Sequence, residues 1–145
     1  MIVLDANVLL YAYDRNSPLH AAAAEWFSAA MSGEDLVGMP WQSVAAFLRV
    51  ATNPRLATGV VAAQVPGIVA SWLEQPHVRL LSPGERHWPL LREMMHDGQA
   101  FGPLVSDAQL AALTIEHGGT LYTTDRDFAR FPGLRWTNPL ARGSR

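Results

Sequence analysis

The chain has 145 residues, a net charge of −2 and no cysteine. This length predicts one domain with its own core, and the absence of cysteine excludes disulfides, thiolate metal sites and a cysteine nucleophile. The slightly acidic charge argues against a broad basic face for nucleic acid, though not against a local one.

Two further features of the sequence bear on location. No segment has the ~20 consecutive apolar residues of a membrane span. The first residues lead straight into a strand and lack the pattern of a signal peptide. We therefore expect a soluble cytoplasmic protein with no membrane partner.

Short β-rich runs alternate with longer helical runs. In chain order we expect a strand at residues 1–4, a helix at 20–31, a strand at 35–39, helices at 41–52 and 58–73, a strand at 78–81, helices at 82–96 and 104–117, a strand at 120–123, a helical turn at 125–131 and a strand at 134–137.

Caps and turn residues set several of these boundaries. Ser17 and Pro18 are typical of a helix N-cap followed by proline at the first helical position. Residues 82–85, with the sequence SPGE, match a capping box. Pro66 predicts an interruption of its helix, because proline removes a hydrogen bond there. Gly118 is typical of a helix C-terminus.

This alternation predicts an α/β fold with a mostly parallel sheet of about four to five strands, flanked by helices on both faces. We expect one domain over residues 1–140 and a flexible C-terminal tail over 141–145. Ligand sites in such sheets lie beyond the carboxyl ends of the strands. Asp5 follows the first strand and Asp125 follows the strand at 120–123, so both acids should reach the same edge.

Each acid near this edge also has an ordinary interpretation. Asp107 lies in the first turn of a helix, where the helix dipole favours a carboxylate. Asp125 is a candidate N-cap, with Asp127 close behind. Asp5 could be a hydrogen-bonded acid at a strand end, since a buried charge is costly without a partner.

Taken together, these acids indicate a metal site. Several carboxylates cannot share a small site in ionised form without repulsion. Mg²⁺ resolves this conflict because it prefers oxygen ligands and binds through a few carboxylates and substrate phosphates. Such an ion lowers the pKa of water and stabilises charge during phosphodiester displacement. The set therefore predicts a nuclease or a phosphatase.

The sequence resembles the PIN-domain ribonucleases, specifically the VapC toxins of VapBC toxin–antitoxin pairs. Four segments in order carry this resemblance: LDANVLLYA, PWQSVAAFLRVATNPR, SDAQLAALTIEHG and TLYTTDRDFARFPGLRWTNP. They cover nearly the whole chain. The resemblance implies a PIN-like fold with catalytic, metal-binding acids at Asp5, Asp107 and Asp125, and a further metal ligand at Asp127.

The second segment departs from the family pattern. Many relatives carry a glutamate three residues before the arginine that corresponds to Arg49, but this chain has Ala46. The usual set of acids is therefore one short, which predicts weaker metal binding. Gln42 lies one helical turn before Ala46 and could offer a neutral oxygen, or it could be a surface residue. We predict that Ala46→Glu tightens the binding of Mg²⁺ or Mn²⁺.

Other polar residues are candidates for supporting roles. Asn7 is placed to orient the first acid or a water, and Thr124 and Ser106 to hydrogen-bond the acids or a phosphate. Arg49 and Arg126 are candidates for RNA phosphates, because arginine suits bidentate phosphate contact. The alternatives are a turn residue for Asn7, a helix cap for Ser106 and solvated surface residues for the two arginines. No histidine pair has metal-ligand spacing, so we expect no catalytic histidine.

Four of the five tryptophans are candidates for stacking on RNA bases. Scattered tryptophans are more often found in cores or interfaces, so the sequence alone leaves their role open. They are Trp41, Trp72, Trp88 and Trp136.

The resemblance implies a Mg²⁺- or Mn²⁺-dependent endoribonuclease in which an activated water attacks phosphorus and leaves a 5′-phosphate. It also implies a homodimer and a VapB-type antitoxin that inserts a segment into the acidic groove. Operator DNA would be bound only through that antitoxin. Whether the RNA substrate is tRNA, rRNA or mRNA does not follow from the sequence.

Three alternatives stay open. Asp5 could be the nucleophile of a receiver or phosphatase that forms an aspartyl phosphate. With alanine at residue 46, the chain could instead bind RNA or an antitoxin without cutting. A PIN-domain nuclease of RNA processing, outside any toxin–antitoxin pair, is the third.

Overall fold

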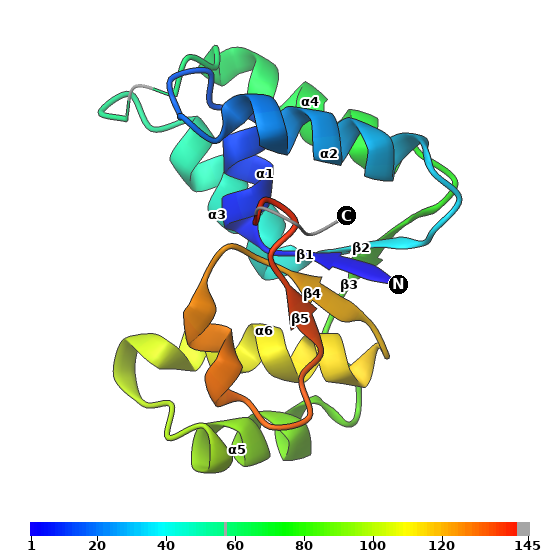
Figure 1. The fold of residues 1–145 in the computed structure, drawn as a ribbon, viewed down its shortest axis with the longest axis vertical. Helices are drawn as coiled ribbons and strands as arrows, with labels where there is room; N and C mark the ends of the chain where they lie inside the picture. The colour runs from blue at the N-terminus through cyan, green and yellow to red at the C-terminus, as the bar shows by residue number, and fades with distance from the viewer. Residues whose placement is uncertain (57, 142–145) are drawn as a thin grey trace.

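The computed structural model describes residues 1–56 and 58–141. Its centre is a single sheet in the order β3-β2-β1-β4-β5, in which every pairing is parallel (Figure 1). The strands are β1 (Ile2–Leu4), β2 (Val37–Pro40), β3 (Val78–Leu81), β4 (Thr120–Tyr122) and β5 (Trp136–Thr137). This confirms the predicted α/β class and the predicted strands, and the sheet is entirely rather than mostly parallel.

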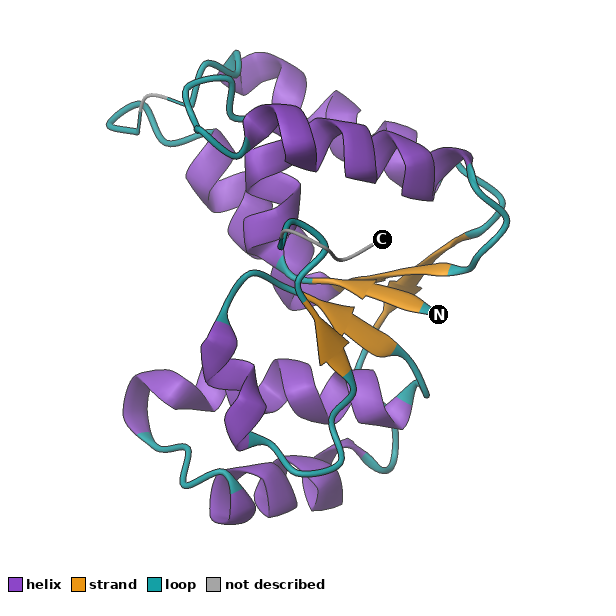
Figure 2. Ribbon diagram, viewed as in Figure 1, coloured by secondary structure: helices purple, strands orange, loops and turns teal. Residues whose placement is uncertain are grey.

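Helices cover both faces of the sheet (Figure 2). The α-helices are α1 (Ala6–Tyr13), α2 (His20–Ser32), α3 (Trp41–Ala51), α4 (Val65–Leu73), α5 (His87–Asp97) and α6 (Val105–Glu116). The 3₁₀ helices are η1 (Ala62–Gln64), η2 (Gly102–Leu104) and η3 (Arg126–Arg130). The first four α-helices lie on one side of the sheet, and α5, α6 and η3 lie on the other (Figure 1). In the part of the chain described, no helix is long and apolar enough to cross a membrane.

Each face of the sheet has its own hydrophobic core. On the first side, the rings of Tyr13, Phe27, Phe47 and Trp72 pack with centroids 4.7 to 5.9 Å apart. The indole N–H of Trp72 donates to the Tyr13 hydroxyl at 2.8 Å, so the one polar atom of that ring is satisfied inside the core. Trp72 is therefore a core residue and not a base-stacking group.

The core on the second side holds α5 and α6 against the sheet. It is built from apolar side chains of these two helices, of β1 and β4, and of the segment around η3: Val3, Leu91, Met94, Leu110, Leu113, Leu121, Phe128 and Phe131. This packing fixes where the first turn of α6 lies relative to the strand ends.

Two helices differ from the predicted elements. Helix α1 has no predicted counterpart; it starts directly after β1, where the Asp5 side chain caps it by accepting from Ala6 N–H. The helix predicted at 58–73 begins only at Val65, and Pro66 lies in its first turn rather than interrupting it. Proline is well tolerated in a first turn because that N–H has no helical partner.

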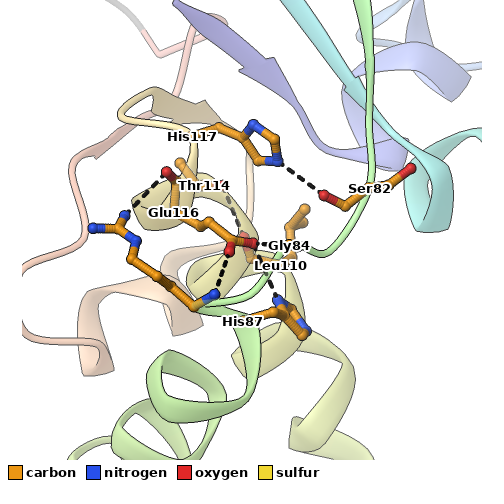
Figure 3. A network of polar contacts seen from close by, with 8 residues as sticks. Ser82, Gly84, His87, Leu110, Thr114, Glu116 and His117 are labelled. Atoms are coloured by element: carbon orange, nitrogen blue, oxygen red, sulfur yellow. Dashed lines mark hydrogen bonds and ion pairs between the residues drawn. The ribbon is translucent and has the colours of Figure 1, made fainter.

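The predicted capping box before α5 is wrong, because α5 begins only at His87 and has no side-chain cap; a distant residue instead binds the turn before it (Figure 3). The Glu116 carboxylate, at the end of α6, accepts from Gly84 N–H at 2.8 Å and from Arg86 N–H at 3.0 Å. Beside it, His117 Nε2 donates to the Ser82 carbonyl at 3.0 Å. These contacts fasten the end of α6 to the connection between β3 and α5. Of the predicted C-terminal tail, residues 142–145 lie outside the described residues.

Candidate active site

The carboxyl ends of β1 and β4 bring the predicted acids to one edge of the sheet. Leu4 pairs with Tyr122 in the parallel register, and Asp5 N–H donates to the Tyr122 carbonyl at 3.1 Å. The residues after both strands therefore emerge side by side. Asp125 follows β4 and caps η3 by accepting from Asp127 N–H at 2.9 Å. The prediction that Asp5 and Asp125 share an edge is confirmed.

The hydroxyl of Thr123 connects these segments. Thr123 is fully buried, and its Oγ1 donates to Asp5 Oδ2 at 2.7 Å. The same oxygen accepts from Asn7 Nδ2 at 3.2 Å and from Asp125 N–H at 3.1 Å. One hydroxyl therefore fixes the Asp5 carboxylate, the Asn7 amide and the backbone of the Asp125 loop.

Asn7 and Thr124 take part in the same network. Asn7 Oδ1 accepts from Thr124 N–H at 3.4 Å, so Thr124 contributes its backbone, while the connecting hydroxyl belongs to Thr123. Both threonines are candidates from the sequence, but sequence reasoning selected Thr124, because Thr123 could as easily be an ordinary strand residue. The signal that favours Thr123 is its position, since it directly follows β4 and lies beside Asp5 at the end of the neighbouring strand.

Three carboxylates gather beside this network. One carboxylate oxygen each from Asp107, Asp125 and Asp127 lies within 4.8 Å of the others. Asp107 and Asp125 are half-buried and Asp127 is exposed, so the group lies at the surface of the edge. Within residues 1–56 and 58–141, no hydrogen-bond donor meets the Asp107 side chain.

Burial and neighbouring negative charge both act on the pKa values of these acids. Burial is the main cause that raises the pKa of Asp107 to about 6, and the charges of Asp125, Asp5 and Asp127 raise it further, while Arg130 opposes the shift. Burial also raises the pKa of Asp5, although its hydrogen bonds from Thr123 and from Ala6 N–H act against this.

These residues fit a hard divalent cation. Carboxylate oxygens are the ligands that Mg²⁺ and similar ions prefer in proteins. A cation would also relieve the repulsion that raises the pKa of Asp107. The Asp107, Asp125 and Asp127 group is therefore a candidate metal site, with Asp5 next to it.

Gln42 lies next to the acids, but the contact that it makes is through its amide nitrogen and not through the neutral oxygen that the sequence suggested as a ligand. Its Nε2 donates to the Ser106 carbonyl at 3.0 Å, which joins the first turn of α3 to the first turn of α6, next to Asp107. Ser106 contributes this carbonyl, and α6 has no side-chain N-cap. Ala46 is half-buried one helical turn after Gln42, on the same face of α3.

The arginines divide into exposed and half-buried ones. Arg49, in the last turn of α3, and Arg126, in η3, are both exposed. Sequence reasoning missed Arg130, which is half-buried and close enough to act on the pKa of Asp107. One guanidinium nitrogen of Arg130 donates to the Gly98 carbonyl at 3.3 Å, while its buried Nε has no partner among the described residues.

The sequence of this chain matches a protein family and several known proteins. Residues 2–134 match the PIN domain family. Ribonuclease VapC33 of Mycobacterium tuberculosis is 38% identical over 141 residues, which cover 97% of this chain and 99% of that protein. Ribonuclease VapC37 of the same species is 39% identical over 142 residues, with the same coverage of each chain.

A solved structure extends the comparison to the fold. The structure of VapBC2 from Rickettsia felis, bound to a DNA fragment from its promoter, matches with a TM-score of 0.67 at 17% identity. The match covers 95% of this chain and 98% of that chain.

Proposed function

This chain belongs to the PIN-domain family, among the VapC ribonucleases, and on that premise we propose that it is a metal-dependent endoribonuclease toxin. The observation that carries the proposal is the group of Asp107, Asp125 and Asp127 beside the Thr123-bound Asp5. The substrate is RNA, whether tRNA, rRNA or mRNA.

We assign the acids to two tasks. Asp107, Asp125 and Asp127, with Asp5 beside them, would hold Mg²⁺ or Mn²⁺, which when bound would lower the pKa of water and offset the charge of the phosphate. Asp5 is the acid with fixed hydrogen bonds and a raised pKa, which suits it to accept a proton from the attacking water. The water attacks phosphorus in line with O3′, and the bond from phosphorus to O3′ breaks. The departing O3′ takes a proton from solvent, so a 5′-phosphate and a 3′-hydroxyl result.

The crowded carboxylates also offer a binding site for a protein partner. We propose that a VapB-type antitoxin silences the enzyme by pairing an arginine with the crowded carboxylates, since arginine binds carboxylates in a bidentate way. Operator DNA is then bound through the antitoxin, in line with the promoter fragment in the related VapBC2 complex. The toxin itself is proposed to be a homodimer in the cytoplasm.

Cleavage of total cellular RNA tests the proposal. The protein is incubated with Mg²⁺, Mn²⁺ or EDTA, and the cleaved ends are mapped by sequencing. We expect discrete 5′-phosphate ends that disappear with EDTA and with Asp5→Asn. The matched control is Asp35→Asn, an exposed acid in the loop before β2, which should cut like the unmodified protein.

A second function is favoured by one observation, the alanine at position 46. With an acid fewer than many relatives have, the chain would bind RNA or its antitoxin without cutting. Failure to cut RNA with any metal, by a protein that still binds RNA and is folded by circular dichroism, would support this second function and remove the first.

A further inference from the structure

The outward face of α5 carries a groove that the proposed chemistry does not use. The groove has a volume of about 280 Å³ and is lined by Trp88, Arg92, Met95, His96 and Phe101. Trp88 and Phe101 are each 63% exposed. The opposite face of α5 is packed in the core through Leu91 and Met94, and Met95 lies partly buried between the core and the groove.

An exposed aromatic stripe of this kind needs an explanation. Trp88, Arg92 and Met95 follow one another at helical spacing, and Phe101 closes the groove after α5 ends. Large apolar groups gathered at a protein surface typically mark an interaction site. The remaining question is which partner fits.

The chemistry of the lining favours a nucleic-acid base. Four of the five lining side chains end in a planar group: an indole, a guanidinium, an imidazole and a phenyl ring. Such groups stack on unpaired bases, and every base has a face to offer.

The charges around the groove have both signs. Arg92 supplies a cation within the groove for the phosphate backbone. Glu93 and Asp97 line an adjoining hollow that shares Arg92 and His96 with the groove. His96 Nδ1 hydrogen-bonds Asp97 Oδ1 at 2.8 Å, which orients the imidazole. Binding should therefore depend on stacking more than on charge.

A short stretch of chain joins the groove to the proposed catalytic edge. Phe101 directly precedes η2, which leads into the first turn of α6 and Asp107. Arg130, at the end of η3, donates to the Gly98 carbonyl in the same connection between α5 and α6. One strand of RNA that passes the acids would follow this connection to reach the groove.

We propose that this groove binds one unpaired base of the RNA substrate between the rings of Trp88 and Phe101, and so contributes to the choice of cleavage site. The inference rests on the proposed function for the identity of the ligand. It makes Trp88 and Phe101 determinants of specificity that take no part in the chemical step.

A binding measurement tests the groove without cleavage. The Asp5→Asn protein in EDTA is titrated into a fluorescein-labelled single-stranded RNA, and anisotropy gives Kd. We expect Trp88→Ala and Phe101→Ala each to raise Kd about tenfold, as for loss of one stacked base. Trp88→Phe should retain most of the affinity. The matched control is Trp41→Ala, which removes a tryptophan that is 50% exposed on α3, outside the groove.

Cleavage of modified RNA then tests whether the groove recognises a single base. A synthetic RNA that carries the mapped cleavage site receives a single abasic nucleotide at each position in turn. One abasic position should slow cleavage by the unmodified protein about tenfold and leave the Trp88→Ala protein unaffected.

The opposing outcomes are distinct. Equal Kd values for Trp88→Ala, Phe101→Ala and the parent protein would overturn the proposal. So would a change from dimer to monomer in light scattering with RNA affinity unchanged, since the groove would then be an interface between two copies. Absence of cleavage by the unmodified protein would count against the nuclease alone, because the anisotropy titration does not need cleavage.

Discussion

The two ends of α6 each carry a carboxylate, and the two are held in opposite ways. Glu116, at the C-terminal end, accepts two backbone N–H groups and lies 4.0 Å from His87 Nδ1 (Figure 3). Asp107, at the N-terminal end, meets no hydrogen-bond donor in the described chain and faces other acids. The dipole of α6 alone would favour Asp107 and disfavour Glu116.

This difference separates a structural acid from a functional one. Glu116 lies where the N-terminus of α5 needs an acceptor, so its lone pairs are used and its charge is stabilised. Asp107 is held among like charges with its pKa raised, which costs stability that the fold alone does not require. Perturbed acids of this kind are typical of sites that bind a cation or act on a substrate.

The largest expected effect is on cleavage. Asp107→Asn should lower the initial rate of RNA cleavage by roughly 100-fold or more, because a ligand for the metal is lost. Glu116→Gln should leave the rate within about twofold, because that carboxylate is remote from the reaction. The rates are measured on one RNA with a mapped cleavage site. A comparable loss for Glu116→Gln would end the distinction between the two ends of α6.

The free energy of unfolding should depend more on Glu116 than on Asp107, the reverse of the cleavage rate. In EDTA, Glu116→Ala should lower the free energy of unfolding by about 2 kcal/mol, because two N–H groups lose a charged acceptor. Asp107→Asn should raise it, because a repelled charge is removed. Urea denaturation at pH 7 measures both, and Glu116→Gln should fall between Glu116→Ala and the parent. Destabilisation by Asp107→Asn would mean that Asp107 has a structural partner.

Sequence reasoning reached the acids of this comparison for a physical reason. Parallel strands that alternate with helices must end at one edge, so Asp5 and Asp125 could be paired without coordinates. Asp107 was assigned through the resemblance of SDAQLAALTIEHG to the family, because its place in a helical first turn also has an ordinary explanation. The strands and most helices were recovered because their apolar patterns are local.

What the sequence could not supply depends on contacts between distant segments. The SPGE pattern at residues 82–85 predicts a local cap, but Glu116 binds this turn instead because α5 and α6 pack together. Thr123 resembles an ordinary strand residue until the β1–β4 register places it beside Asp5. Helix α1 was missed because its eight residues are mostly apolar and directly follow a buried strand.

A smaller effect should follow from restoring the acid that the chain lacks. Ala46→Glu should tighten Mn²⁺ binding roughly tenfold, because affinity rises with the number of charged ligands. The matched control is Ala45→Glu, an exposed neighbour on another face of α3. Titration calorimetry measures both. Equal affinities for the two variants would show that residue 46 does not face the group of acids, contrary to the family alignment.

The smallest effect is a change of stability with pH in the metal-free protein. The folded-state pKa of Asp107 is about 6, above an unfolded value near 3.8. Below pH 4 the residue is protonated in both states and contributes no difference. Between about pH 4 and 6 the unfolded chain binds fewer protons than the folded one, so stability falls as the pH rises. Above pH 6 the loss from Asp107 is complete.

Asp107→Asn isolates this contribution from those of the other acids. The difference in unfolding free energy between Asp107→Asn and the parent, measured by urea denaturation in EDTA, should grow from pH 4 to pH 6 and then level off. Asp5 also has a raised pKa, so some slope of the same sign should remain in the variant. A pH-independent difference for Asp107→Asn would mean that neither burial nor the neighbouring charges disfavour the ionised form of Asp107. The contrast between the ends of α6 would then be one of hydrogen bonding alone.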